Sequence, residues 1–134
     1  MANYAGNGVT HTFLADVDLS NYQYYLMAAA STAGKVTPSI TAGGSIIGVL
    51  QNDPVAGEEA TIVVLGPTKV RVTAEATASP LSFGGWVKSS STGQATGFVS
   101  ATASTWAAGW YMDTAFTSGS GVYAEMFVLP ERIV

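Results

Sequence analysis

The sequence has 134 residues, the usual length of one compact domain, and no cysteine, which excludes disulfides and thiolate metal sites. Only 10% of the residues are charged, against about 25% in ordinary globular proteins, and the formal net charge is −4. The five basic residues are too few and too scattered to neutralise a row of phosphates, so nucleic acid is not an expected partner.

The hydrophobic fraction is 48%, so the chain must either cover its surface with small polar side chains or bury part of it against a partner. No stretch has the leucine and isoleucine density of a membrane span, and residues 1–12 lack the basic and apolar regions of a secretory signal. We therefore expect a protein that assembles with other proteins and has no membrane partner.

The first strands are expected after a polar start. Residues 1–12 contain asparagine and glycine without an apolar pattern, and we expect them to form a flexible, extended N-terminal arm. Residues 22–30 predict a strand, residues 31–34 a turn and residues 35–40 a second strand, which together make a hairpin. The alanines at the end of the first strand also allow a short helix, an alternative that the sequence leaves open.

The middle of the chain predicts buried strands. Residues 45–51 are apolar and end at an Asn-Asp-Pro turn. Residues 60–65 are continuously apolar, whereas residues 69–75 alternate, with Lys69 and Arg71 on one face. The Gly-Pro-Thr segment between these two runs predicts a tight connection, and so we expect them to pair as two antiparallel strands.

Short strands continue to the end of the chain. Paired glycines predict a bend or bulge inside a strand at residues 81–88, and residues 94–101, 106–112 and 122–129 predict three more strands. We therefore expect roughly nine or ten strands in the whole chain. The expected fold is mainly β, a single small antiparallel β-barrel or sandwich-like domain over residues 13–134 that follows the arm at residues 1–12.

Two segments of the chain, which we call the internal echo, have a similar sequence pattern. Residues 48–67 and 109–130 each run from a glycine through apolar residues and a polar, glycine-containing turn to a strand that ends in Val-Leu near a proline. Two similar β modules would explain the echo, and so would chance.

Titratable residues give little indication of catalysis. His11 is the only histidine, and no neighbour in the sequence would orient it as a general base. Asp16 and Asp18 would share a strand face, which suits calcium binding or glycoside hydrolysis, but a solvated strand edge explains them equally well. The glycines near Lys35 and Gly119 lack the other features of nucleotide-binding loops. We expect no enzymatic activity, no metal and no cofactor.

Aromatic residues are the more informative candidates for binding. Tyr22 and Tyr24 would share one strand face, Trp106 and Trp110 would share another, and Trp86 follows the paired glycines. Exposed aromatic residues stack on sugars or anchor protein interfaces, whereas buried ones only fill the core. These five residues are the candidates for an oligomer or partner interface.

Three consecutive stretches carry a resemblance to a known family: ADVDLSNYQYY at residues 15–25, IGVLQNDPVAGEE at residues 47–59 and ATIVVLGPTKVRV at residues 60–72. The middle stretch is the most specific, because strand chemistry alone does not require Gly-Val-Leu-Gln-Asn before Pro-x-x-Gly-Glu. In these stretches the chain resembles the capsid cement, or head decoration, proteins of tailed bacteriophages. Roughly half of the chain is covered, and residues 92–113 depart from the family pattern.

The resemblance implies a structural virion protein that binds the outer surface of the assembled head and stabilises the capsid. Such proteins act as homotrimers at local threefold points, so the implied partners are the major capsid protein and further copies of the chain, which is made in the host cytoplasm. No catalytic residue or cofactor is implied. We further expect the arm to become ordered on the capsid through Asn3, Tyr4, Asn7 and His11.

Three other interpretations remain open. Paired aromatic residues also suit a carbohydrate- or receptor-binding β module of a phage tail or fibre. Another virion component of similar construction, such as a fibre-base protein, would have the same sequence features. A small hydrolase that uses Asp16 and Asp18 ranks last, because a base, a nucleophile and a metal set are all missing from the pattern.

Overall fold

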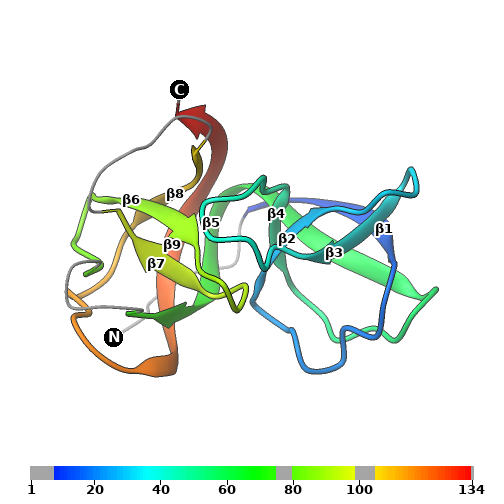
Figure 1. Ribbon diagram of the computed structural model, residues 1–134, viewed down its shortest axis with the longest axis horizontal. Coiled ribbons are helices and arrows are strands. Elements are labelled where there is room, and N and C mark those ends of the chain that lie inside the picture. Colours follow the sequence, from blue (N-terminus) through cyan, green and yellow to red (C-terminus); the bar gives the residue numbers. More distant parts are fainter. Residues whose placement is uncertain (1–7, 75–79, 99–104, 134) are drawn as a thin grey trace.

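The computed structural model describes residues 8–74, 80–98 and 105–133, and within these ranges it contains strands and no helix (Figure 1). The predicted mainly β fold is confirmed. The nine strands are β1 (Val9–Ala15), β2 (Leu26–Ala29), β3 (Lys35–Pro38), β4 (Gly48–Leu50), β5 (Glu59–Thr73), β6 (Trp86–Ser89), β7 (Ala95–Gly97), β8 (Thr105–Tyr111) and β9 (Ser120–Ile133).

Strand pairing closes two rings that share β5. In the first barrel the pairing runs β1, β3, β2, β4, residues 59–65 of β5 and back to β1. In the second barrel it runs through residues 66–73 of β5, β7, β6, β8, β9 and back to β5. A single small antiparallel barrel or sandwich-like domain was expected; within it the strands close two small barrels side by side, each with one parallel pair (Figure 1).

β5 is one continuous strand where two strands joined by a tight turn were predicted. Gly66, with a φ of 106°, redirects the backbone from the first barrel into the second without reversing it. A Cβ at this position would lie 2.9 Å from the Cα of Gly8, so the glycine also admits the close passage of the chain before β1. Gly-Pro-Thr suits a bend as well as a turn, and the long pairings of β5 with β1 and β9 decide in favour of the bend.

The two barrels repeat one another in topology and in register. The first barrel counts its strands from β1 to β5, and the second counts its own from β5 to β9. In each barrel the first strand pairs parallel with the third and antiparallel with the fifth. The fourth strand pairs antiparallel with both the second and the fifth. Gly48 in β4 and Gly109 in β8 occupy equivalent places. A Cβ on Gly48 would lie 2.0 Å from the carbonyl oxygen of Val63, and one on Gly109 would lie 1.9 Å from that of Phe127. The sequence echo thus corresponds to the same strand pair in each barrel.

Buried side chains fill both barrels and the junction between them. The first barrel encloses Ala15, Leu19, Met27, Val36, Leu50, Ala60 and Ile62. A second group combines the interior of the second barrel, which includes Val70, Val87, Tyr111 and Met126, with Leu26, Ile46, Val49 and Val63 of the first. Since neighbouring residues of a strand face opposite sides, β4 and β5 fill the first barrel with one side and contact the second barrel with the other. The two barrels therefore pack as one body.

Two predicted boundaries near the N-terminus are wrong. Residues 9–12 were assigned to the arm, but they belong to β1, because their main chain pairs along residues 61–65 of β5. Residues 1–7, the rest of the predicted arm, lie outside the described residues. The strand predicted at residues 22–30 begins only at Leu26, because Tyr24 has a left-handed φ of 67° and turns precede it.

Candidate functional site

An open apolar groove of about 410 Å³ lies on the second barrel. Its lining residues are Phe83, Gly84, Trp110, Tyr111, Met112, Phe127 and Leu129. Trp110 of β8 pairs with Trp86 of β6 on one side and with Phe127 of β9 on the other, so three large rings form a row across three strands. The rings of Trp86 and Trp110 meet edge to face, with centroids 5.8 Å apart.

The groove is exposed and offers few polar groups to a ligand. Phe83 is 79% exposed, Trp110 47% and Trp86 38%. The lining contains one side-chain hydroxyl, that of Tyr111, which donates a hydrogen bond to the carbonyl oxygen of Thr114 at 2.6 Å. Large apolar side chains that are exposed and grouped typically anchor a protein partner.

One acidic side chain, Asp113, holds the loop beside this groove. The Asp113 carboxylate accepts hydrogen bonds from the N–H of Thr114 at 2.7 Å and from that of Glu125 at 3.2 Å. Burial, with a smaller contribution from Asp113, raises the pKa of Tyr111 to about 12. Burial and the same carboxylate also raise the pKa of Glu125. These hydrogen bonds fix the loop that follows β8 and so hold one wall of the groove in place.

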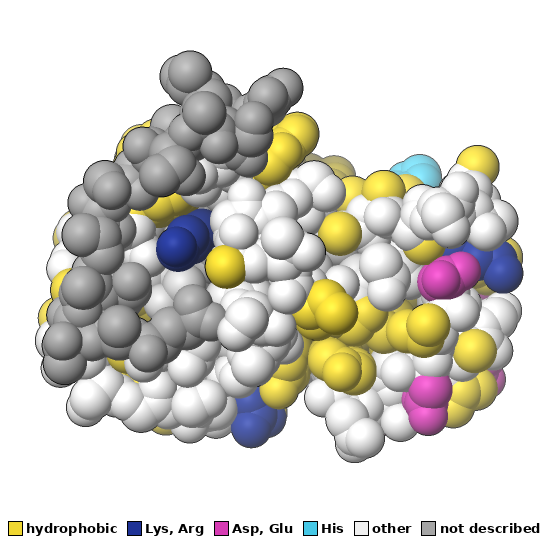
Figure 2. Space-filling view, in the orientation of Figure 1, with side chains coloured by type: hydrophobic (Ala, Val, Ile, Leu, Met, Phe, Trp, Pro, Cys, Tyr) yellow, Lys and Arg dark blue, Asp and Glu magenta, His cyan; other side chains and the backbone are white. Residues whose placement is uncertain are grey.

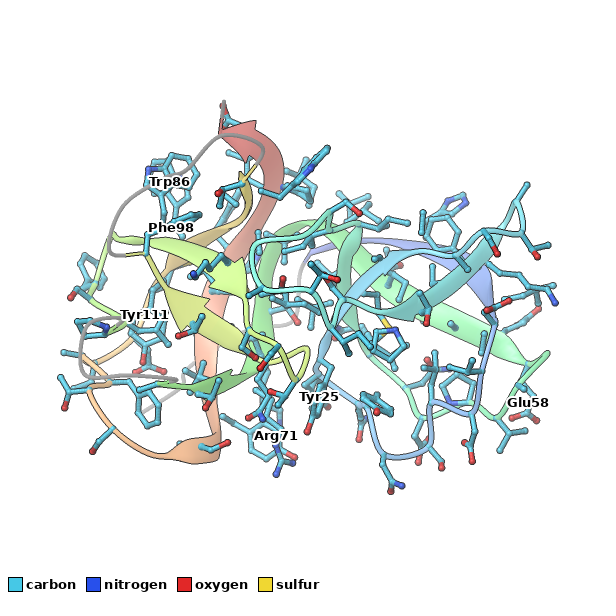
Figure 3. The ribbon with its side chains drawn as sticks, viewed as in Figure 1. Tyr25, Glu58, Arg71, Trp86, Phe98 and Tyr111 are labelled. Atoms are coloured by element: carbon cyan, nitrogen blue, oxygen red, sulfur yellow. The ribbon has the colours of Figure 1, made fainter. Side chains whose placement is uncertain are left out.

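A second cluster combines tyrosines with two cations where the barrels meet. The Lys69 ammonium lies 4.6 Å from the ring centroid of Tyr24 and 4.9 Å from that of Tyr123. The Arg71 guanidinium lies 5.5 Å from the Tyr123 ring, donates a hydrogen bond to its hydroxyl at 3.3 Å and also approaches Tyr25. Figure 3 shows Arg71 and Tyr25 together at the junction, well apart from Trp86 on the second barrel. These contacts tie β5 and β9 to the turn before β2.

The five predicted interface aromatics separate into three places. The structure brings Trp86 and Trp110 together, whereas Trp106 is only partly exposed and does not line the groove. Tyr22 and Tyr24 were expected on one strand face, but both lie in the turn before β2. The Tyr22 ring packs on Tyr25 at 5.0 Å, and the Tyr24 ring packs on Tyr123 at 5.6 Å.

Sequence reasoning missed Phe83 and Phe127 as members of the groove. The signal for Phe127 was available, because alternation in β9 places it opposite the buried Met126 and Val128. No signal pointed to Phe83, which lies in a turn and reaches the groove only through the fold.

The remaining candidates do not come together as a catalytic site. The exposed His11 ring in β1 contacts the Phe13 ring at a tilt of 59°, with centroids 4.7 Å apart, while Asn3, Tyr4 and Asn7 lie outside the described residues. Asp18 accepts a hydrogen bond from the backbone N–H of Ser20, which lowers its pKa. Within residues 8–74, 80–98 and 105–133, no three or more His, Cys, Asp or Glu side chains form a group that could hold a metal ion.

The surface in Figure 2 is mostly uncharged, and the acidic side chains visible there lie over the first barrel. The parts of the chain that the structure describes contain no helix with the length and apolar character of a membrane span.

Comparisons with known proteins identify a fold and no family. No protein-family model matches the sequence, and no curated protein sequence matches it. Among solved structures, the chain is similar to the head fiber gp8.5 N base in bacteriophage phi29, with a TM-score of 0.63 and 15% sequence identity. The match covers 94% of this chain and 98% of that one, so the two proteins share a fold over nearly their full lengths.

Proposed function

We propose that this chain is a structural protein of a bacteriophage virion, that it binds the outer surface of the assembled head through the major capsid protein, and that it stabilises the shell. The main support is the fold shared, over nearly the full length of both chains, with a protein described as a head fiber base. The resemblance of residues 15–25 and 47–72 to cement and decoration proteins points to the same function, although no family model or curated sequence matches the chain.

The physical properties of the chain suit attachment to a shell. Burial of roughly 800 Å² per partner is enough for a specific protein contact. The cement family implies a homotrimer, and three identical contacts on one trimer would combine into durable attachment even where each is weak. We propose no catalytic step and no cofactor for this chain.

A carbohydrate-binding module is the second candidate, because Trp86 and Trp110 lie side by side at the surface. Sugar sites combine aromatic platforms with several hydrogen-bonding groups that satisfy the sugar hydroxyls. The groove offers one side-chain hydroxyl, that of Tyr111, and this hydroxyl already donates its hydrogen bond to the Thr114 carbonyl oxygen. The lining therefore favours a protein partner over a glycan.

Co-sedimentation with heads that lack this protein tests the proposal. We expect saturable binding to such heads and no binding to heads that already carry a full complement. A glycan array with wild-type protein and with Trp110→Ser examines the alternative. Tryptophan-dependent glycan binding without head binding would overturn the proposal in favour of the sugar-binding module.

Removal of residues 2–7 tests the proposed contribution of the N-terminal segment to capsid contact. The truncation has to end before Val9, because Val9–Ala15 forms β1 and pairs with β5. We expect weaker head binding at an unchanged melting temperature. Replacement of residues 2–7 with a Gly/Ser segment of equal length is the matched control, since it keeps the chain length and removes Asn3, Tyr4 and Asn7. Full binding by both variants would contradict a role for these residues.

A further inference from the structure

Corresponding residues of the two barrels differ sharply in burial at one place. In the first barrel Leu26 pairs with Val49, which pairs with Val63. The same three ladder positions in the second barrel hold Trp86, Trp110 and Phe127. The first row is 0%, 0% and 3% exposed, whereas the second row is 38%, 47% and 36% exposed. One fold surface thus occurs twice in the chain, covered once and open once.

The second barrel covers the row on the first. Leu26, Val49 and Val63 belong to the same buried group as Val70 and Val128 of the second barrel.

The turn between β6 and β7 reinforces this junction. The N–H of Leu26 donates a hydrogen bond to the carbonyl oxygen of Gly93 at 2.9 Å. Nearby, the Ser39 and Ser89 hydroxyls are hydrogen-bonded at 3.3 Å. Within the chain, the surface of the first barrel that carries Leu26, Val49 and Val63 is therefore covered by a barrel of the same topology. That barrel contacts it through the turn between its second and third strands, β6 and β7.

We propose that the open row on the second barrel binds the first barrel of another copy of this chain, head to tail. The first barrel presents the corresponding turn between β2 and β3, in which residues 31–34 are exposed. The covered row uses aliphatic residues and the open row uses aromatic ones, the residue types enriched in interfaces between separate chains. This inference goes beyond the proposed function, because it names the surface by which copies associate and requires no head.

The contact between copies differs in one respect from the contact within the chain. Inside the chain the Tyr24 carbonyl accepts a hydrogen bond from the N–H of Arg71, next to the Gly93 contact. In the first barrel the equivalent β1 and β3 backbones pair directly, with the Leu14 N–H donating to the Gly34 carbonyl at 2.9 Å. The contact between copies therefore depends on side chains, chiefly the aromatic row. A head-to-tail contact gives a closed ring, such as a trimer, when its rotation returns to the first copy, and an open filament when it does not.

Two variants separate the two sides of the proposed contact. Phe83→Asp places a charge in the groove at a residue that is 79% exposed, so the fold should tolerate it. Ala33→Arg alters the exposed β2–β3 turn. Val55→Ser is the control for a change at an exposed apolar residue outside both sides of the contact, since Val55 is 47% exposed and lies in the loop between β4 and β5.

Light scattering after size exclusion measures the mass of each protein against the 13.8 kDa of one chain. We expect wild type and Val55→Ser to form closed oligomers, and each of the other two variants alone to associate about 30-fold or more weakly. Mixed one to one, Phe83→Asp and Ala33→Arg keep one intact contact between them and should form a dimer.

Other outcomes overturn the inference. A wild type that stays a monomer up to about 1 mM, far above the Kd of specific complexes, shows that the row is not a self-association surface. Oligomers of Ala33→Arg that match wild type indicate a symmetrical face-to-face contact. Failure of the mixture to form dimers, with both variants folded by circular dichroism, also contradicts head-to-tail association.

Discussion

A methyl group at Gly48 should destabilise the protein strongly. The added Cβ of Gly48→Ala would lie 2.0 Å from the carbonyl oxygen of Val63, in the strand that β4 pairs with. Restoring an ordinary contact distance requires β4 and β5 to separate by about 1.4 Å, which breaks hydrogen bonds that need about 2.9 Å. Overpacking costs about 1–3 kcal/mol and each lost hydrogen bond about 1 kcal/mol, so we expect a loss of about 3–5 kcal/mol.

Urea unfolding followed by circular dichroism measures this loss. With a slope of about 2 kcal/mol per molar urea, the midpoint should fall by about 2 M. Gly57→Ala is the control, because its Cβ would meet nothing within 4 Å and only the φ of +85° is strained. That strain costs about 1–2 kcal/mol. Equal midpoints for the two variants would refute the close approach of β4 and β5.

Three further predictions concern the junction and the groove. Leu26→Ala should lower the free energy of unfolding by about 2–5 kcal/mol, and Trp86→Ala by only about 1–2 kcal/mol. Urea unfolding at protein concentrations too low for association measures both losses, and equal losses would contradict the difference in burial. Because the folded state keeps the Tyr111 proton up to a pKa of about 12 and an unfolded tyrosine loses it near 10.0, stability should fall as the pH rises between these values. Tyr111→Phe should lessen that fall, and an unchanged pH profile would refute the assignment. Arg71→Met should lower stability by about 0.5–2 kcal/mol through the lost contacts with Tyr25 and Tyr123, and no change in melting temperature would show that the cluster contributes nothing.

The sequence predicted the β class and the position of most strands because short β-branched and aromatic runs alternate with turn residues. It predicted strand ends poorly. The run at residues 22–30 is continuous in composition, yet β2 begins at Leu26, because the left-handed backbone at Tyr24 follows from packing against the second barrel. Local propensity carries no information about such a contact.

The division into two barrels was the largest element that local patterns missed. Gly66-Pro67 looks like a turn in any window of the sequence, and only the pairings of β5 with β1 and β9 keep the strand continuous. The internal echo was the one available indication. The structure shows that this similarity reflects a repeat, because Gly48 and Gly109 occupy the same position of the strand pairing and a Cβ on either would clash with a carbonyl oxygen of the neighbouring strand.

The candidate surface was predictable in part. Trp86 and Trp110 were both named from the sequence, but their pairing across β6 and β8 was not, since it depends on register. Trp106 was grouped with Trp110 by spacing, and the structure leaves it outside the groove. Burial separates these tryptophans, and burial depends on the neighbouring strands.

The most direct test of the proposed function is electron cryomicroscopy of heads assembled with and without this protein. We expect difference density on the outer surface of the shell, with two small barrels fitting each copy and copies in contact through the Trp86 and Trp110 face. Heads that show no added density after incubation with a saturating amount of folded protein, or density confined to the tail, would contradict it.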